Sequence, residues 1–233
     1  MQIKFPYWKN HCTTPPVLSQ HEEFEIEYDY MLLEKAKQQV KTLGRQDLHF
    51  SGINTPKILF HGFSNPHIAL KMLRNGLLNP TNELKWFTNT TQRAACSYGM
   101  RIEKEFYEEI KKMGLHNFEI EGHPDWYKAN QLKEDLKYVL VVFPHEDTLL
   151  GKWLVDEGAP TAYANSSEYI TDLDINLSDV VFVRLDKLRP YIQLIDSGKV
   201  TRKEELMGLL NVNEEDQLQI RDSLRSELER CHT

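Results

Sequence analysis

Two short apolar runs constrain what this chain can fold into more than any other feature of its sequence. They are residues 137–143 (KYVLVVF) and 180–185 (VVFVRL), and both are rich in β-branched and aromatic side chains. Strands that are buried on both faces have nearly continuous apolar sequences of this kind. The two runs therefore predict buried strands of a sheet.

Shorter patterns predict three further strands. Residues 57–60 (KILF) form an apolar run, residues 85–89 (KWFTN) have the aromatic content of a strand, and residues 167–172 (SEYITD) also read as a strand. Such segments, rich in aromatic and β-branched residues and bounded by polar or turn-forming residues, are typical of strands. Residues 45–56 and 145–165 show no such pattern, and we predict connections there.

Helical periodicity separates and follows these strands. Apolar residues recur at three- and four-residue steps, as on one face of a helix. The predicted helices are residues 21–43, 67–77, 91–114, a segment after Pro124 and most of the charged chain after Pro190. Between two of them, residues 118–121 read as a short strand. The sequence therefore predicts a chain in which short strands alternate with helices.

Charge and composition exclude several classes of function. The chain has 233 residues, with 28 Lys and Arg against 35 Asp and Glu, and so a formal net charge of −7. This charge disfavours a protein whose main task is to bind bulk nucleic acid or an anionic membrane. Cys12, Cys96 and Cys231 form no CxxC pair, which favours a reducing compartment. The opening MQIKFPYWKN lacks the apolar core of a signal peptide, so we expect a cytoplasmic protein. Leaderless delivery into another cell would leave no trace in the sequence.

Common catalytic motifs are absent from the sequence, which contains no GxxxxGK[ST], HExxH, GxSxG or EF-hand loop. Candidate residues must then be sought at strand ends. Three places stand out: His61-Gly62, the aromatic segment with Trp86, Phe87 and Tyr98, and Glu168. Taken singly, each has a plain structural explanation as a hydrogen-bonded histidine, core aromatics or a surface carboxylate.

The order and flanks of these segments change that interpretation. From residue 60 the chain reads FHGFSNPHIALKMLRNGLLNP, then WFTNTTQRAACSYG, and finally SSEYITD. Together they resemble the catalytic domain shared by poly(ADP-ribose) polymerases and diphtheria-type ADP-ribosyltransferases. The resemblance implies an α+β fold built as a split β-sheet sandwich with flanking helices. It covers roughly residues 57–190, the expected NAD-binding core. We expect an N-terminal arm and helix over residues 1–56 and a C-terminal helical tail over 191–233 on either side of it.

The resemblance implies that Glu168 is the catalytic carboxylate. Breaking the bond between ribose and nicotinamide gives a transition state like an oxocarbenium ion, as in glycoside hydrolysis. Glu168 would accept a hydrogen bond from the nicotinamide-ribose 2′-hydroxyl while its charge opposes the developing cation. Nicotinamide leaves as a neutral molecule, so no general acid is needed, and no metal is expected. We also expect Thr88 to be one of the NAD-binding residues.

The other residues of the resemblance would hold the co-substrate. His61 would bind the adenosine ribose, and the Gly62 backbone would pair with the nicotinamide carboxamide, an approach that a Cβ would hinder. Tyr98 would stack on the nicotinamide ring opposite Trp86 or Phe87. Spacing to Tyr98 favours Phe87, whereas the order of aromatics in the polymerases favours Trp86. His61, Tyr98 and Glu168 make the expected catalytic constellation.

We therefore expect a mono-ADP-ribosyltransferase that cleaves the nicotinamide–ribose bond of NAD and transfers ADP-ribose to a macromolecular acceptor, with a protein favoured. Two alternatives remain open, an NAD glycohydrolase and a catalytically inactive binding module of the same fold. Arginine-modifying toxins carry a second Glu where this chain has Ser166, which disfavours arginine transfer on that pattern. Whether the protein is a toxin, an effector or a housekeeping enzyme stays open.

Overall fold

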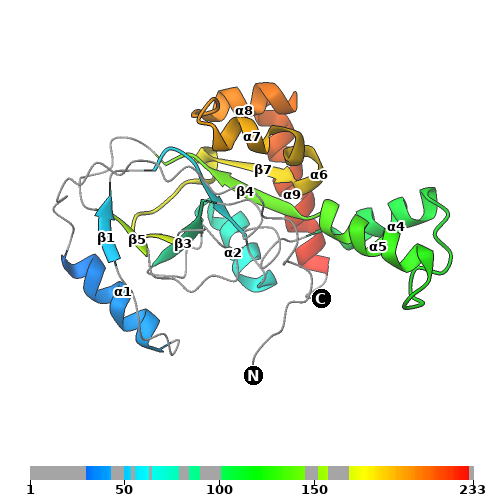
Figure 1. The fold of residues 1–233 in the computed structure, drawn as a ribbon, viewed down its shortest axis with the longest axis horizontal. Coiled ribbons are helices and arrows are strands. Elements are labelled where there is room, and N and C mark those ends of the chain that lie inside the picture. Colours follow the sequence, from blue (N-terminus) through cyan, green and yellow to red (C-terminus); the bar gives the residue numbers. More distant parts are fainter. Residues whose placement is uncertain are drawn as a thin grey trace.

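A seven-stranded antiparallel sheet forms the centre of the computed structural model (Figure 1). The structure describes residues 30–42, 50–53, 56–62, 65–78, 84–89, 101–144, 152–156 and 168–230. The strands are β1 (Phe50–Ile53), β2 (Leu59–His61), β3 (Lys85–Thr88), β4 (Tyr138–Val142), β5 (Trp153–Asp156), β6 (Glu168–Thr171) and β7 (Val180–Arg184). They lie in the order β1-β5-β6-β3-β2-β4-β7. The mixed α+β class and the five predicted strands are confirmed, with boundaries shifted by a residue or two.

The outer strands β1 and β5 correct the prediction of plain connections over 45–56 and 145–165. They pair with each other along their whole length, from Phe50 opposite Asp156 to Ile53 opposite Trp153. The sequence of β1, FSGI, contains a glycine and a serine, which weaken a strand signal. Pairing with a distant segment, rather than local propensity, makes this strand.

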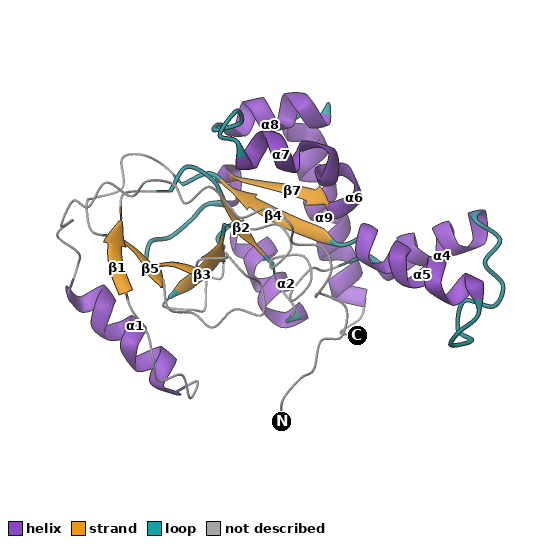
Figure 2. Cartoon of the chain, viewed as in Figure 1, coloured by secondary structure: helices purple, strands orange, loops and turns teal. Residues whose placement is uncertain are grey.

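Eight α-helices lie within the described parts of the chain (Figure 2). They are α1 (Tyr30–Thr42), α2 (Pro66–Asn75), α4 (Glu103–Lys112), α5 (Pro124–Asp135), α6 (Leu185–Leu188), α7 (Ile192–Asp196), α8 (Lys203–Leu210) and α9 (Glu214–Arg230). Single 3₁₀ turns precede β7 and follow α6, at Leu177–Asp179 and Arg189–Tyr191. None of these helices is both long enough and apolar enough to cross a membrane.

Helix α2 confirms the predicted helix at 67–77. The side chain of Asn65 accepts a hydrogen bond of 2.9 Å from the backbone N–H of His67 and so caps its start. Its end is closed by Gly76, whose φ of 69° lies in the left-handed region that favours glycine. Helix α1 confirms the described part of the helix predicted at 21–43.

Two helical predictions need correction between residues 91 and 121. A continuous helix over 91–114 is wrong, because α4 begins at Glu103 and Ile102 before it is extended, with φ −87° and ψ 116°. Residues 90–100 lie outside the described residues. The strand predicted at 118–121 is also wrong, since those residues form turns. Phe118 instead packs edge-on against Phe106, 6.2 Å between ring centroids, inside the α4–α5 hairpin.

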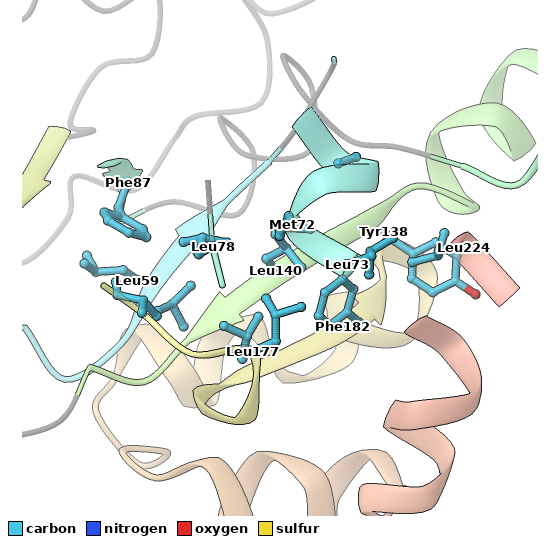
Figure 3. Packing of buried hydrophobic residues seen from close by; sticks show 14 of the residues in the cluster. Leu59, Met72, Leu73, Leu78, Phe87, Tyr138, Leu140, Leu177, Phe182 and Leu224 are labelled. Atoms are coloured by element: carbon cyan, nitrogen blue, oxygen red, sulfur yellow. The ribbon is translucent and has the colours of Figure 1, made fainter. Parts of the chain in front are cut away.

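The two faces of the sheet carry different helices. One face, here named the α2 face, packs against α2 and α9 (Figure 3). The buried cluster there includes Leu59, Phe87, Leu140 and Phe182 from the sheet, Met72 and Leu73 from α2, and Leu224 and Leu228 from α9. The opposite face, named the α1 face, is covered by α1 over β3, β5 and β6, and by α6, α7 and α8 over β2, β4 and β7.

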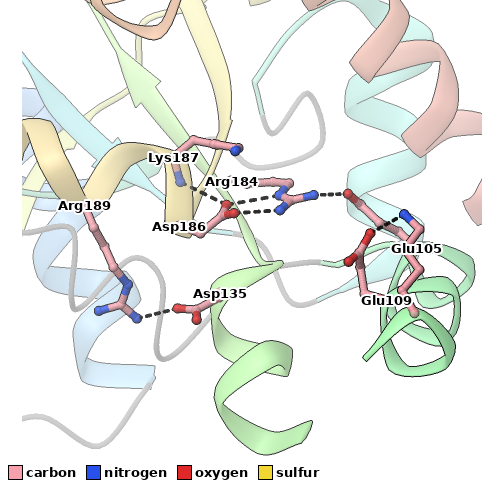
Figure 4. Close-up of polar contacts among 8 residues, drawn as sticks. Glu105, Glu109, Asp135, Arg184, Asp186, Lys187 and Arg189 are labelled. Atoms are coloured by element: carbon pink, nitrogen blue, oxygen red, sulfur yellow. Dashed lines mark hydrogen bonds and ion pairs between the residues drawn. The ribbon is translucent and has the colours of Figure 1, made fainter. Parts of the chain in front are cut away.

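An ion-pair network joins the projecting α4–α5 hairpin to the sheet (Figure 4). Arg184 at the end of β7 donates to both carboxylate oxygens of Asp186, at 3.0 and 2.6 Å, and also pairs with Glu105 of α4. Burial opposes its charge, but the two carboxylates outweigh that effect and raise the pKa of the Arg184 guanidinium. Burial, and next the charge of Glu105, raise the pKa of Tyr138 to about 12, so its hydroxyl stays protonated.

Candidate functional site

The centre of the sheet contains a seam between β2 and β3. These strands share only one aligned residue pair, Phe60 opposite Thr88. By contrast, β3 aligns with β6 through four pairs and β2 with β4 through three. The candidate residues come from three distant segments that are neighbours in the sheet. Strand β2 ends at His61 and β3 ends at Thr88 at this seam, and β6 begins at Glu168 on the far side of β3.

The imidazole of His61 bridges the seam. Its Nδ1 lies 2.7 Å from the backbone carbonyl oxygen of Trp86 on β3, and the side chain is buried. A carbonyl oxygen can only accept a hydrogen bond, so Nδ1 carries the hydrogen and donates the hydrogen bond. In the neutral ring this fixes Nε2 as the acceptor nitrogen. A side-chain hydrogen bond thus joins the two strands just beyond their aligned pair.

Gly62 follows His61 directly and lies beyond the paired part of β2. Its backbone is partly exposed. A glycine at this point brings no side chain between the end of β2 and anything that approaches it. The position therefore suits close contact between the backbone and a ligand.

Trp86 and Phe87 project to opposite faces of the sheet, as strand alternation requires. The Phe87 ring is 3% exposed and lies on the α2 face, 5.5 Å from the His61 ring and 5.6 Å from Trp153 between centroids. The Trp86 ring lies on the α1 face, is only partly buried, and donates from Nε1 to Oε1 of Gln39 on α1 at 3.1 Å. Phe87 is therefore a core residue, whereas Trp86 is only partly buried.

Glu168 lies directly opposite Thr88, and both side chains are buried, at 9% and 6% exposed. Alternation along β6 puts Glu168 on the same face as Ile170, which packs with Trp86 against α1. Trp86, Thr88 and Glu168 consequently share the α1 face. By the same alternation His61, two residues after Leu59, lies on the α2 face beside Phe87. Strand β3 separates it from Glu168, and its imidazole reaches β3 across the seam.

The structure thus brings six of the seven predicted site residues onto three adjacent strands. Five are members of the strands and Gly62 immediately follows β2. The remaining one, Tyr98, lies outside the described residues, as does Ser166. Among the residues that the structure does describe, no group of three or more His, Cys, Asp or Glu side chains could hold a metal ion.

Gln39 is the site neighbour that the sequence did not single out. It belongs to α1, 47 positions before Trp86, and no motif surrounds it. Only the packing of α1 on the sheet reveals the contact. No protein-family model, no curated protein and no solved structure matches the chain.

Proposed function

We propose that this protein is a mono-ADP-ribosyltransferase that uses NAD as co-substrate, with a split-sheet fold of the ADP-ribosyltransferase type. One observation carries the proposal. The three segments on which the resemblance rests become the neighbouring strands β2, β3 and β6 at the centre of one sheet, although His61 and Glu168 are far apart in the sequence. The nearly unpaired seam between β2 and β3 supports the split.

The seam supplies groups that suit the adenosine ribose and the carboxamide. Because Nδ1 of His61 donates to Trp86, its Nε2 is the nitrogen that accepts from a ribose hydroxyl. Gly62 can present its N–H and C=O to the carboxamide, which offers one acceptor and two donors in return. Backbone and imidazole groups, rather than a basic patch, would then hold NAD, in keeping with the acidic balance of the chain.

The α1 face supplies groups that suit the reacting end. Glu168 is nine-tenths buried, so its charge would act on the ribosyl cation with little screening by water. Trp86 lies on the same face and is only partly buried, whereas Phe87 is enclosed, which makes Trp86 the better partner for stacking on nicotinamide. Phe87 is enclosed in the core beneath and supports the strand. Tyr98 would stack on the other face of the nicotinamide ring.

The decisive experiment incubates the protein with NAD labelled in its ADP-ribose part. We expect label on a protein acceptor and free nicotinamide in equal amounts. Replacing Glu168 with Gln keeps shape but removes charge, and should lower NAD consumption by about 10²-fold or more, as for loss of one electrostatic stabiliser. Glu119→Gln, an exposed change on the α4–α5 hairpin, is the matched control and should leave the rate unchanged.

This assay, together with a binding measurement, separates the alternatives. Free ADP-ribose with no labelled macromolecule would identify an NAD glycohydrolase. Binding of NAD without consumption, measured by calorimetry, would identify an inactive binding module. An unchanged rate of NAD consumption in the folded Glu168→Gln variant would contradict the role assigned to this residue.

A further inference from the structure

We propose that Gln39 is a positioning residue that orients the Trp86 indole for stacking on nicotinamide, so that helix α1 forms part of the NAD site. The inference rests on the proposed function and extends it to a segment outside the resemblance. Its basis is the hydrogen bond of 3.1 Å from Trp86 Nε1 to Gln39 Oε1. Nε1 is the one polar atom of an indole ring, so holding it fixes how the ring is turned.

Apolar packing holds α1 against the same ring. Leu32, Leu33 and Ala36 of α1 are buried in one cluster with Leu154 and Ile170 of the sheet, and Trp86 packs against that cluster. The indole thus packs against apolar side chains of α1 and of the sheet. Gln39, about two turns along the helix from Leu32, adds a directional contact to this apolar packing.

A second polar contact ties α1 to the strands that carry the site. Lys35 Nζ lies 3.4 Å from Oδ2 of Asp172, the residue that follows β6. The buried Lys85, next to Trp86, donates to the backbone carbonyl of the same Asp172 at 3.2 Å. Helix α1 is therefore fixed against both β3 and β6, the strands of Trp86 and Glu168.

Trp86 consequently connects α1 to the seam through two different groups. Its side chain is held by Gln39, while its backbone carbonyl accepts from His61. A change at Gln39 should disturb the ring and leave the carbonyl in place, because four aligned pairs with β6 hold the backbone of β3. The effect should therefore fall on nicotinamide and spare the adenosine half of NAD.

The test compares Gln39→Leu with Gln38→Leu, the same change one position away at an exposed site. We expect Gln39→Leu to weaken inhibition by nicotinamide about threefold to tenfold, the factor typical of one neutral hydrogen bond. The dissociation constant of ADP-ribose should stay unchanged. Gln39→Glu, which keeps an acceptor oxygen, should restore nicotinamide inhibition, and Trp86→Phe should make the Gln39→Leu change silent.

Spectroscopy provides a readout that does not depend on turnover. The indole N–H resonance of Trp86 should shift in Gln39→Leu and stay in place in Gln38→Leu. Nicotinamide binding that is equal in wild type and Gln39→Leu would overturn the inference alone. A wild-type protein that binds neither nicotinamide nor NAD would overturn the proposed function and this inference with it, whatever the indole resonance shows.

Discussion

Neighbouring residues Trp86 and Phe87 show how much one step along a strand decides. Both are aromatic, and the sequence left open which one would stack on nicotinamide in the proposed site. Alternation sends Phe87 into the core beside Trp153 and His61, whereas Trp86 faces α1 on the side of Glu168. Their chemistry is similar, so burial and direction separate their roles.

This difference predicts opposite effects of replacing each ring with leucine. Trp86→Leu should lower kcat/KM for NAD by about tenfold through loss of stacking and cation–π attraction, with a modest change in stability. Phe87→Leu should lower the free energy of unfolding by about 1–3 kcal/mol and leave kcat/KM of the folded protein nearly unchanged. Denaturant unfolding and steady-state kinetics on both variants would test this, and the reverse pattern would assign stacking to Phe87.

At the scale of elements, α9 covers the edge of the sheet at β7. Strand β7 is an edge strand, and Phe182 in it aligns with Leu140 on one side only. On the other side the buried Gln217 accepts from the Phe182 N–H at 2.7 Å and donates from Nε2 to the Phe182 carbonyl at 3.2 Å. One side chain thus occupies the place of a further strand, and an unpaired edge is a site of aggregation.

Gln217→Leu should therefore cost more than an ordinary surface change. It leaves a buried N–H and C=O of Phe182 without partners, which should lower the free energy of unfolding by about 2–3 kcal/mol. Gln219→Leu, an exposed change on the same helix, should stay within about 0.5 kcal/mol of the wild type. Urea titration measures both. Equal stability of the two variants would mean that water satisfies the Phe182 backbone as well as Gln217 does.

Elements with a strong local signal were predictable, and those made by distant pairing were not. The runs of β4 and β7 are apolar throughout and were found, whereas β1 is a strand through its partner β5. The candidate strands at the site were likewise found from local sequence. The contact of Gln39 with Trp86 was beyond reach, because it depends on how α1 packs on the sheet.

At the scale of the whole molecule, the C-terminal helix belongs to the main core. The expected division into arm, core and tail stays a prediction. Within the structure, however, Leu224 and Leu228 of α9 are buried in the same cluster as α2 and the sheet. Arg74 of α2 also donates to Glu229 of α9 at 3.1 and 2.7 Å.

Truncating Leu224 tests whether this helix supports the fold. Leu224 is fully buried, so Leu224→Ala should lower the free energy of unfolding by about 2–5 kcal/mol. Leu218→Ala on the same helix, where the side chain is 53% exposed, should have little effect. A single shared unfolding transition by fluorescence and circular dichroism would show that α9 and the sheet unfold together; a separate early transition for α9 would show that it is an independent unit.

The seam between β2 and β3 also divides the molecule into two leaves. One leaf holds β1, β5, β6 and β3 under α1, and the other holds β2, β4 and β7 under α6, α7 and α8. Among the described residues, a single aligned backbone pair, the His61 side chain and the packing on the α2 face join them. Distant substitutions without shared partners combine additively. Each leaf can therefore accumulate changes on its outer face largely independently of the other, while the residues at the join constrain both.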